Sequence, residues 1–121
     1  MAQVADLHYL PQPMVITLPA QIDIANADHV GQELCSAITP DVKTVIADMT
    51  ATTFCDSSGI SMLVRAHKQA AANGAELRLV VLAAAVLRAL TLVEIDSLLP
   101  IYPTLSRALA EPPAPGNRAS D

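Results

Sequence analysis

The sequence predicts an α/β domain built on a mixed, mainly parallel sheet of four to five strands, with about four helices packed against it. Short β-branched and aliphatic runs alternate along the chain with segments whose apolar residues recur every three or four positions, which is typical of strands alternating with amphipathic helices. The 121 residues are 52% hydrophobic but only 2% aromatic, so a single aliphatic core is expected. Because parallel neighbours need crossover connections, each helix should pack back onto the sheet.

The N-terminal segment predicts two short strands, residues 4–10 and 14–18, joined by the turn Pro11-Gln12-Pro13. So short a connection favours an antiparallel pair at one edge of the sheet. Pro19 closes the second strand because proline has no backbone N–H to donate.

A helix should follow, because four apolar residues recur at helical spacing: Ala27, Val30, Leu34 and Ile38. Asn26 or Asp23 is expected to cap it, and the run Thr39-Pro40-Asp41 to end it. Residues 42–49 are β-branched and largely apolar, which indicates a strand covered on both faces.

A second helix is predicted over residues 57–73, followed by Gly74, which can adopt the left-handed conformation that ends helices. Its apolar face is expected to hold Ile60, Leu63, Val64, His67 and Ala71. Residues 77–82 predict another buried strand, residues 84–93 a short helix and residues 99–102 a last short strand. Pro103 and Thr104 should open a terminal helix. We expect a domain over residues 1–110 and a disordered, proline-rich tail over 111–121.

Composition and charge exclude several classes of function. A net charge of −5 and scattered basic residues leave no footprint for nucleic acid. The longest apolar run, residues 79–87, is far short of the roughly 20 residues that a membrane span needs. The N-terminus has no signal-peptide pattern, and Cys35 and Cys55 stand apart without metal-ligand spacing. The sequence therefore predicts a cytoplasmic protein with reduced thiols, no membrane partner, no metal and no cofactor.

The stretch 54–59 (FCDSSG) lies where a strand-like run gives way to the second helix. One interpretation is purely structural, because Asp56, Ser57 and Ser58 are good helix caps. A P-loop would need a longer glycine-rich run with a following lysine, and G-x-S-x-G is absent. His67 is expected to be a partly buried structural histidine. Asp28-His29 is a poor metal site because adjacent helical residues diverge.

A further interpretation makes the junction a substrate of another protein. A serine hydroxyl at an exposed helix start is accessible to a kinase, and a phosphate there would lie among free backbone N–H groups at the positive end of the helix dipole. Phosphorylation would add about −1.5 to −2 charges without unfolding the domain. Such a change in charge would alter the affinity of a protein that docks on that surface.

The sequence resembles the single-domain STAS proteins, specifically the bacterial anti-sigma factor antagonists, over roughly residues 4–109. The most specific match is Phe54 to Ile60, which is similar to the family signature F-x-D-S-[ST]-G-[LI]. Residues 18–23 (LPAQID) are similar to the family's L-x-G-x-[LI]-D. Further similarity lies in residues 72–79 (ANGAELRL), 86–90 (VLRAL) and 96–102.

The resemblance implies a non-enzymatic switch. In that family the first serine after the aspartate, here Ser57, is phosphorylated by a partner anti-sigma factor, an ATP-dependent serine kinase. The unphosphorylated antagonist binds that kinase and so frees a sigma factor, and a PP2C-like phosphatase reverses the modification. By the same match, Asp23, Asp56, Ser58 and Gly59 belong with Ser57 to the partner-binding surface.

The chain departs from the family pattern at several positions. Ala20 and Gln21 replace the usual glycine and acid, Ala84-Ala85 lacks a common proline, and Glu94 stands where many members have glycine. These departures bear on partner choice more than on Ser57. Two alternatives remain: a STAS interaction subunit of a transport or signalling complex that is not phosphorylated, and an enzyme that uses the hydroxyls and carboxylates.

Overall fold

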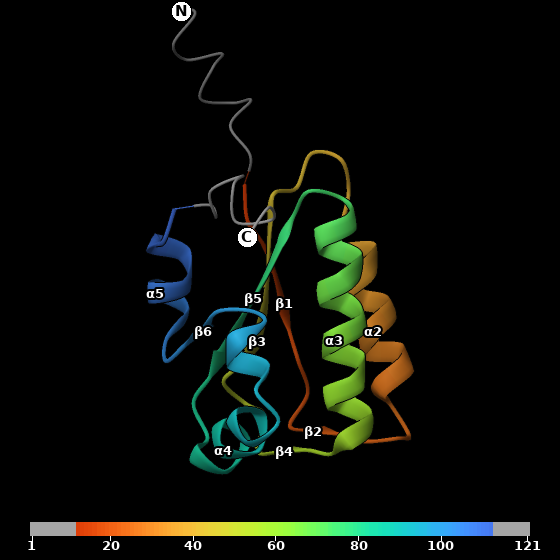
Figure 1. Ribbon diagram of the computed structural model, residues 1–121, viewed down its shortest axis with the longest axis vertical. Coiled ribbons are helices and arrows are strands. Elements are labelled where there is room, and N and C mark those ends of the chain that lie inside the picture. Colours follow the sequence, from red (N-terminus) through yellow and green to blue (C-terminus); the bar gives the residue numbers. More distant parts are fainter. Residues whose placement is uncertain (1–11, 113–121) are drawn as a thin grey trace, which may run out of the picture.

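The computed structural model of the chain describes residues 12–112 (Figure 1). Its elements in chain order are β1 (Met14–Thr17), β2 (Gln21–Ile22), α2 (Ala27–Ser36), β3 (Thr44–Met49), β4 (Phe54–Cys55), α3 (Ser57–Ala72), β5 (Glu76–Val81), α4 (Ala84–Leu92), the 3₁₀ turn η1 (Ile95–Ser97), β6 (Ile101–Tyr102) and α5 (Leu105–Ala110). The predicted strand over residues 4–10, and with it the antiparallel edge pair, lies outside the described residues.

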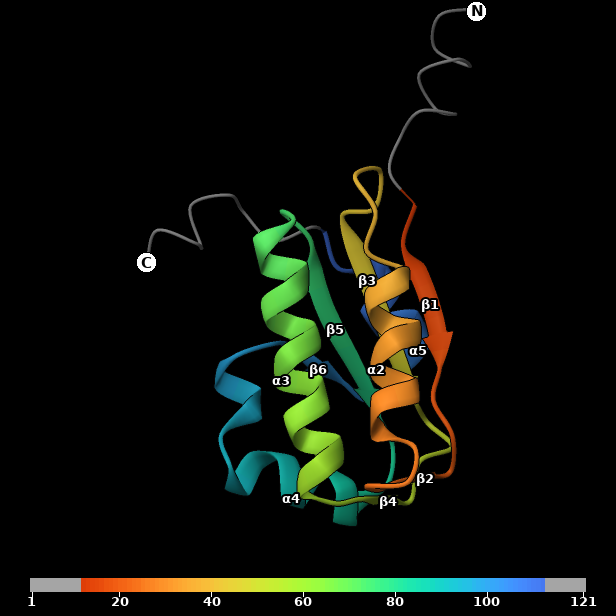
Figure 2. The ribbon, with the colours of Figure 1, turned by 90° about the vertical axis from the view of Figure 1, so that its right-hand side faces the viewer.

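The main sheet has the order β1-β3-β5-β6, and every neighbouring pair of these four strands is parallel. Helices α2 and α3 cover one face, α5 lies on the other, and α4 lies beyond the ends of the strands (Figures 1 and 2). The predicted fold class is therefore confirmed. The first turns of α2 and α3 lie side by side at the end of the molecule near β2 and β4 (Figure 2).

The larger core fills the space between the sheet and the α2–α3 layer. Its side chains from the sheet alternate along β3 and β5, because every second residue of a strand points to the same face. They include Val45, Ala47, Met49, Leu77, Leu79 and Val81. A smaller core of Ile46, Val80 and Ala108 lies on the opposite face under α5. Both central strands are thus covered on both faces, as predicted.

The buried face of α3 differs from the predicted one. Leu63 is buried as expected and Ile60 and Val64 pack at the edge of the core, but Ala71 is exposed. The residues buried instead are Gly59, Met62, Ala66 and Ala70. Because α3 contacts α2 as well as the sheet, its buried stripe is rotated toward α2. In β5, likewise, the predicted buried strand ends at Val81, and Leu82 is 68% exposed.

The C-terminal helix α5 is attached to the sheet by a buried arginine. Arg78, on β5, is 2% exposed. Its Nη1 donates to the carbonyls of Ala108 at 2.6 Å and Glu111 at 3.0 Å, and Nη2 donates to Pro112 at 2.7 Å. Its Nε donates to Glu76 Oε1 at 2.8 Å. Beyond residue 112 the predicted tail lies outside the described residues, and the division into domain and tail stays a prediction.

Candidate functional site

A two-stranded parallel sheet that the sequence did not predict brings the two most specific motifs together. β2 pairs with β4, with Ile22 opposite Cys55. The backbone N–H of Asp56 donates to the Ile22 carbonyl at 3.1 Å. Asp23 and Asp56 therefore follow adjacent positions on neighbouring strands, so the structure brings these two predicted site residues to one edge.

Asp56 is the N-cap of α3. One oxygen, Oδ1, accepts from the backbone N–H of Ser58 at 2.9 Å and of Gly59 at 3.2 Å. The first hydrogen bond of the helix then runs from the Ile60 N–H to the Asp56 carbonyl at 3.0 Å. The structural interpretation of this aspartate is therefore correct. The predicted nest of free N–H groups for a phosphate is wrong in part, because Asp56 occupies two of them.

Ser57 is the first residue of α3, and it is exposed. The next two residues turn progressively inward, since Ser58 is half-buried and Gly59 is buried. The cap is provided by the aspartate, so the Ser57 hydroxyl is not needed to hold the helix start. The three adjacent residues thus have separate environments, and Ser57 is the one most open to another protein.

Gly59 is required at this junction by space. A Cβ built there would lie 2.6 Å from Cys55 Sγ and 2.8 Å from Ile22 Cγ2. Real Cβ atoms essentially never approach other atoms so closely, so the first turn of α3 can press against the β2–β4 pair only with glycine at this position. Ile22 and Cys55 are buried beneath it. The glycine therefore fixes where Ser57 stands relative to both strands.

The turn before α2 is held by its own side chains. Asp23 Oδ1 accepts from the Ala25 N–H at 2.9 Å, and Asn26 Oδ1 accepts from the Asp23 N–H at 3.0 Å. Asn26 Nδ2 also donates to the Gln21 carbonyl at 2.8 Å. Asn26 is at the N-cap position but makes no side-chain cap hydrogen bond. Of the two predicted caps, Asn26 is at the N-cap position, but the prediction that a side chain caps α2 is wrong, because the Asn26 amide and the Asp23 carboxylate close the β2–α2 turn instead.

Two titratable side chains in or after the junction have shifted pKa values. Burial, and secondarily the charge of Asp56, raises the pKa of the Cys55 thiol to about 11. That thiol stays protonated at neutral pH and is a poor nucleophile. Burial, with Lys68 as a smaller cause, lowers the pKa of His67, which is half-buried as predicted. Within residues 12–112, no three metal-ligating side chains gather into a metal site.

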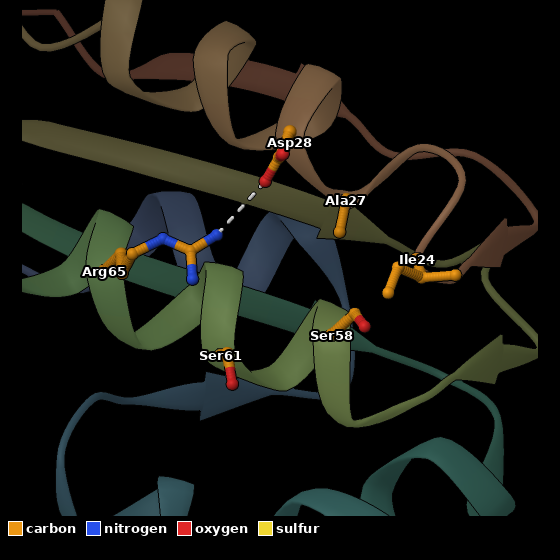
Figure 3. Close-up of a pocket in the computed structure, with 6 residues that line it drawn as sticks. All are labelled: Ile24, Ala27, Asp28, Ser58, Ser61 and Arg65. Carbon is orange, nitrogen blue, oxygen red and sulfur yellow. Dashed lines mark ion pairs between the residues drawn. The ribbon is translucent and has the colours of Figure 1, made fainter.

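A shallow groove of about 270 Å³ lies beside the serines, between the first turns of α2 and α3 (Figure 3). Its lining residues are Ile24, Ala27, Asp28, Ser58, Ser61 and Arg65. Across it, Arg65 Nη2 lies 3.5 Å from Asp28 Oδ1, and both side chains are largely exposed. The groove therefore places two hydroxyls within about one turn of Ser57, and the Arg65 guanidinium about two turns further along α3.

Two large apolar side chains near this edge are left in contact with solvent. Ile24, at the end of the β2–α2 turn, is 83% exposed, and Phe54, on β4, is 50% exposed. The sequence did not predict that Ile24 and Phe54 lie on the surface, and it did not single out Ser61 or Arg65 as site residues. The signal available for Phe54 was its place in the signature motif. Ile24 had none, because an isolated apolar residue in a sequence is ordinarily read as core.

Comparisons with known proteins agree with this architecture. The model of the STAS domain family matches residues 5–108. A search of curated proteins for relatives of the sequence found no match. None of the helices in the described part of the chain is long and apolar enough to span a membrane.

Solved structures with similar folds belong to regulators and to a transporter family. An anti-sigma factor antagonist from Mycobacterium paratuberculosis superposes with a TM-score of 0.71 at 24% identity, over 78% of this chain and 80% of that one. The anti-sigma factor antagonist SpoIIAA in its unphosphorylated form gives 0.68 at 18%, over 90% and 89%. A sulfate transporter family protein from Wolinella succinogenes gives 0.69 at 18%, over 81% and 82%. At these identities the likeness establishes the fold.

Proposed function

The chain belongs to the STAS domain family, and from that premise we propose that it is a cytoplasmic anti-sigma factor antagonist switched by phosphorylation of Ser57. The unphosphorylated protein binds an anti-sigma factor that is itself an ATP-dependent serine kinase, and so releases a sigma factor. Phosphorylation by that kinase dissolves the complex, and a PP2C-like phosphatase restores it. The antagonist itself catalyses nothing and needs no cofactor.

The observation that carries this proposal is the position of Ser57, exposed at the edge where the β2–β4 pair brings the two motifs together. Asp56, and not Ser57, caps the helix start. In the reaction, the Ser57 oxygen forms a bond to the γ-phosphorus of ATP as the bond to the bridging oxygen of ADP breaks. The hydroxyl proton passes to a base of the kinase. The antagonist needs only to present the hydroxyl on a rigid surface.

The new phosphate acts on binding through its charge. Because Asp56 Oδ1 already accepts from the N–H groups of Ser58 and Gly59, the phosphate is not drawn back onto its own helix. Asp56 also repels it. The group therefore projects into the contact with the partner, where about −1.5 to −2 uncompensated charges oppose binding. A loss of a few kcal/mol suffices, since each 1.4 kcal/mol changes an affinity about tenfold.

The test is to mix the protein with each ATP-binding anti-sigma factor of the organism that makes it, add Mg-ATP, and map phosphate by mass spectrometry. We expect one phosphate, on Ser57, and none in Ser57→Ala. Ser106→Ala, at the exposed start of α5 on the opposite face of the sheet, is the matched control, and it should be labelled normally. Ser57→Ala should bind the kinase and resist release by ATP. Full labelling of Ser57→Ala would overturn the site assignment.

A second candidate function is an interaction subunit of a transport assembly that uses the same surface without phosphorylation. The observation that favours it is the structural likeness to the sulfate transporter family protein. Both candidates need the exposed edge around Phe54 and Asp23. Affinity capture with Ser57→Ala as bait decides between them, since recovery of a transporter ATPase in place of a histidine-kinase-like ATPase would support the second.

A further inference from the structure

The groove between α2 and α3 is rich in hydrogen-bond donors. Arg65 and the hydroxyls of Ser58 and Ser61 line one wall, and all three come from α3 (Figure 3). Within the described residues, the guanidinium of Arg65 has one ionic contact, with Asp28 at 3.5 Å. That carboxylate is 92% exposed, so water competes with the contact and the pair is weak. The arginine is therefore available to another acceptor.

The opposite end of the groove is apolar. Ile24 is 83% exposed although it stands on a turn fixed by three hydrogen bonds, those of Asp23 and Asn26. Its backbone is thus held in place while its side chain remains in water. Ala27, which is buried, forms the floor between Ile24 and the charged end. A rigidly presented aliphatic side chain of this kind is suited to be an anchor of an interface.

We propose that this groove is the part of the docking surface that selects the partner, and that it receives a segment of the anti-sigma factor with an aliphatic side chain and a carboxylate. The aliphatic side chain packs on Ile24 and Ala27. The carboxylate binds Arg65 and the Ser61 hydroxyl and displaces Asp28. The inference rests on the proposed function, because the occupant is the same kinase that modifies Ser57.

Charge and position favour this occupant over a cationic one. The groove has one guanidinium and two hydroxyls facing one carboxylate, and an arginine binds a carboxylate through two parallel hydrogen bonds. The surface beyond the groove is acidic, with Asp23 and Asp56 on the neighbouring strand ends. Arg65 is thus a local exception in a chain of net charge −5. It marks where an acidic group of the partner finds a cation, once that group has displaced the exposed Asp28.

The experiment measures the dissociation constant of the anti-sigma factor that phosphorylates Ser57, with the unphosphorylated full-length protein and without ATP. We expect Ile24→Ala and Arg65→Gln each to weaken binding about tenfold, and Arg65→Glu about a hundredfold. Asp28→Asn should tighten binding about twofold to threefold, because it removes the competing carboxylate. Added salt should reduce the effect of Arg65→Gln and leave that of Ile24→Ala unchanged.

Matched controls come from α5 on the opposite face of the sheet. Arg107→Gln removes an exposed cation and Leu109→Ala an exposed aliphatic side chain, and neither should change the affinity. Circular dichroism verifies that each variant is folded.

If Ile24→Ala and Arg65→Gln bind the anti-sigma factor as tightly as the wild type does, the groove is not part of the docking surface. That result would leave the proposed function standing. If Asp28→Asn binds more weakly and Arg65→Gln more tightly, the segment that occupies the groove does not carry a carboxylate. If no anti-sigma factor modifies Ser57, the proposed function and this inference both fail.

Discussion

The starts of helices α3 and α5 have the same local chemistry and different surroundings. At α3, Asp56 accepts from two backbone N–H groups, and at α5, Thr104 Oγ1 accepts from the Arg107 N–H at 3.1 Å. Each first turn carries an exposed serine, Ser57 in α3 and Ser106 in α5. Both serines are thus available to solvent on capped helices, so capping and exposure by themselves do not mark a functional site.

The two regions differ in what lies around the serine. The α5 start follows directly from β6 at the edge of the main sheet, and the helix packs Ala108 into the small core while Arg78 binds its C-terminal end. The α3 start stands on the extra β2–β4 pair, beside exposed Ile24 and Phe54 and a charged groove. The difference teaches that the candidate site is made by two distant segments meeting, and that the serine is only one member of it.

The largest expected contrast is in binding. Ser57→Asp should weaken the affinity for the anti-sigma factor about a hundredfold, because a fixed negative charge then faces the partner. Ser106→Asp adds the same charge at the α5 start and should change the affinity less than about twofold. Titration calorimetry measures both. Equal losses in the two variants would mean that net charge, rather than position, controls the complex.

Gly59→Ala should lower the free energy of unfolding by about 2 kcal/mol, because the new methyl group clashes with Cys55 and Ile22. The contrast is Gly31→Ala in α2, where the added Cβ would lie 2.8 Å from Cγ of the buried Met62 and alanine's helix preference offsets part of the cost. That variant should lose less stability than Gly59→Ala. Urea denaturation of both proteins checks the expectation, and a neutral Gly59→Ala would show that the α3 start is not tightly packed.

Removing the caps should have a smaller effect. Asp56→Ala should destabilise the protein by about 1–2 kcal/mol and Thr104→Ala by about 1 kcal/mol or less, since the aspartate satisfies two N–H groups and the threonine one. Urea denaturation midpoints measure both values. If Thr104→Ala proved the more damaging, α5 would contribute more to the fold than its six residues suggest.

The smallest effect is expected where the chain departs from the family pattern. Glu94 has φ 63° and ψ 30°, a left-handed conformation that is unfavourable for a residue with a Cβ. Glu94→Gly should therefore stabilise the protein by up to about 1 kcal/mol, seen as a higher midpoint of thermal unfolding. Ala20→Gly is the contrast, because Ala20 does not have positive φ, and it should give no gain.

The sequence predicted the long elements because their patterns are long enough to show a period. The strands that became β3 and β5 and the helix that became α3 were predicted within one or two residues of their observed ends. It missed β2 and β4, since each has two residues and neither shows alternation. That omission matters, because this pair joins Asp23 to Asp56. Only the family resemblance had grouped those two aspartates.

Other features depended on tertiary contacts that no local pattern encodes. The rotated face of α3 follows from its contact with α2, and the role of Asn26 follows from a turn closed by Gln21. Arg78 was hidden within an apolar strand, and the three carbonyls that it binds lie about thirty residues further along the chain. Ile24 and Arg65 line one groove only because α2 and α3 pack side by side, which no local sequence pattern predicts. The sequence therefore singled out Ser57 as a candidate, and the structure shows which residues surround it.

The most direct test of the central claim is to prepare the protein with one phosphate on Ser57 and compare its affinity for the anti-sigma factor with that of the unmodified form. We predict a dissociation constant at least about a hundredfold higher for the phosphorylated protein, and full recovery of binding after treatment with a PP2C-like phosphatase. Equal dissociation constants for the two forms would contradict the account.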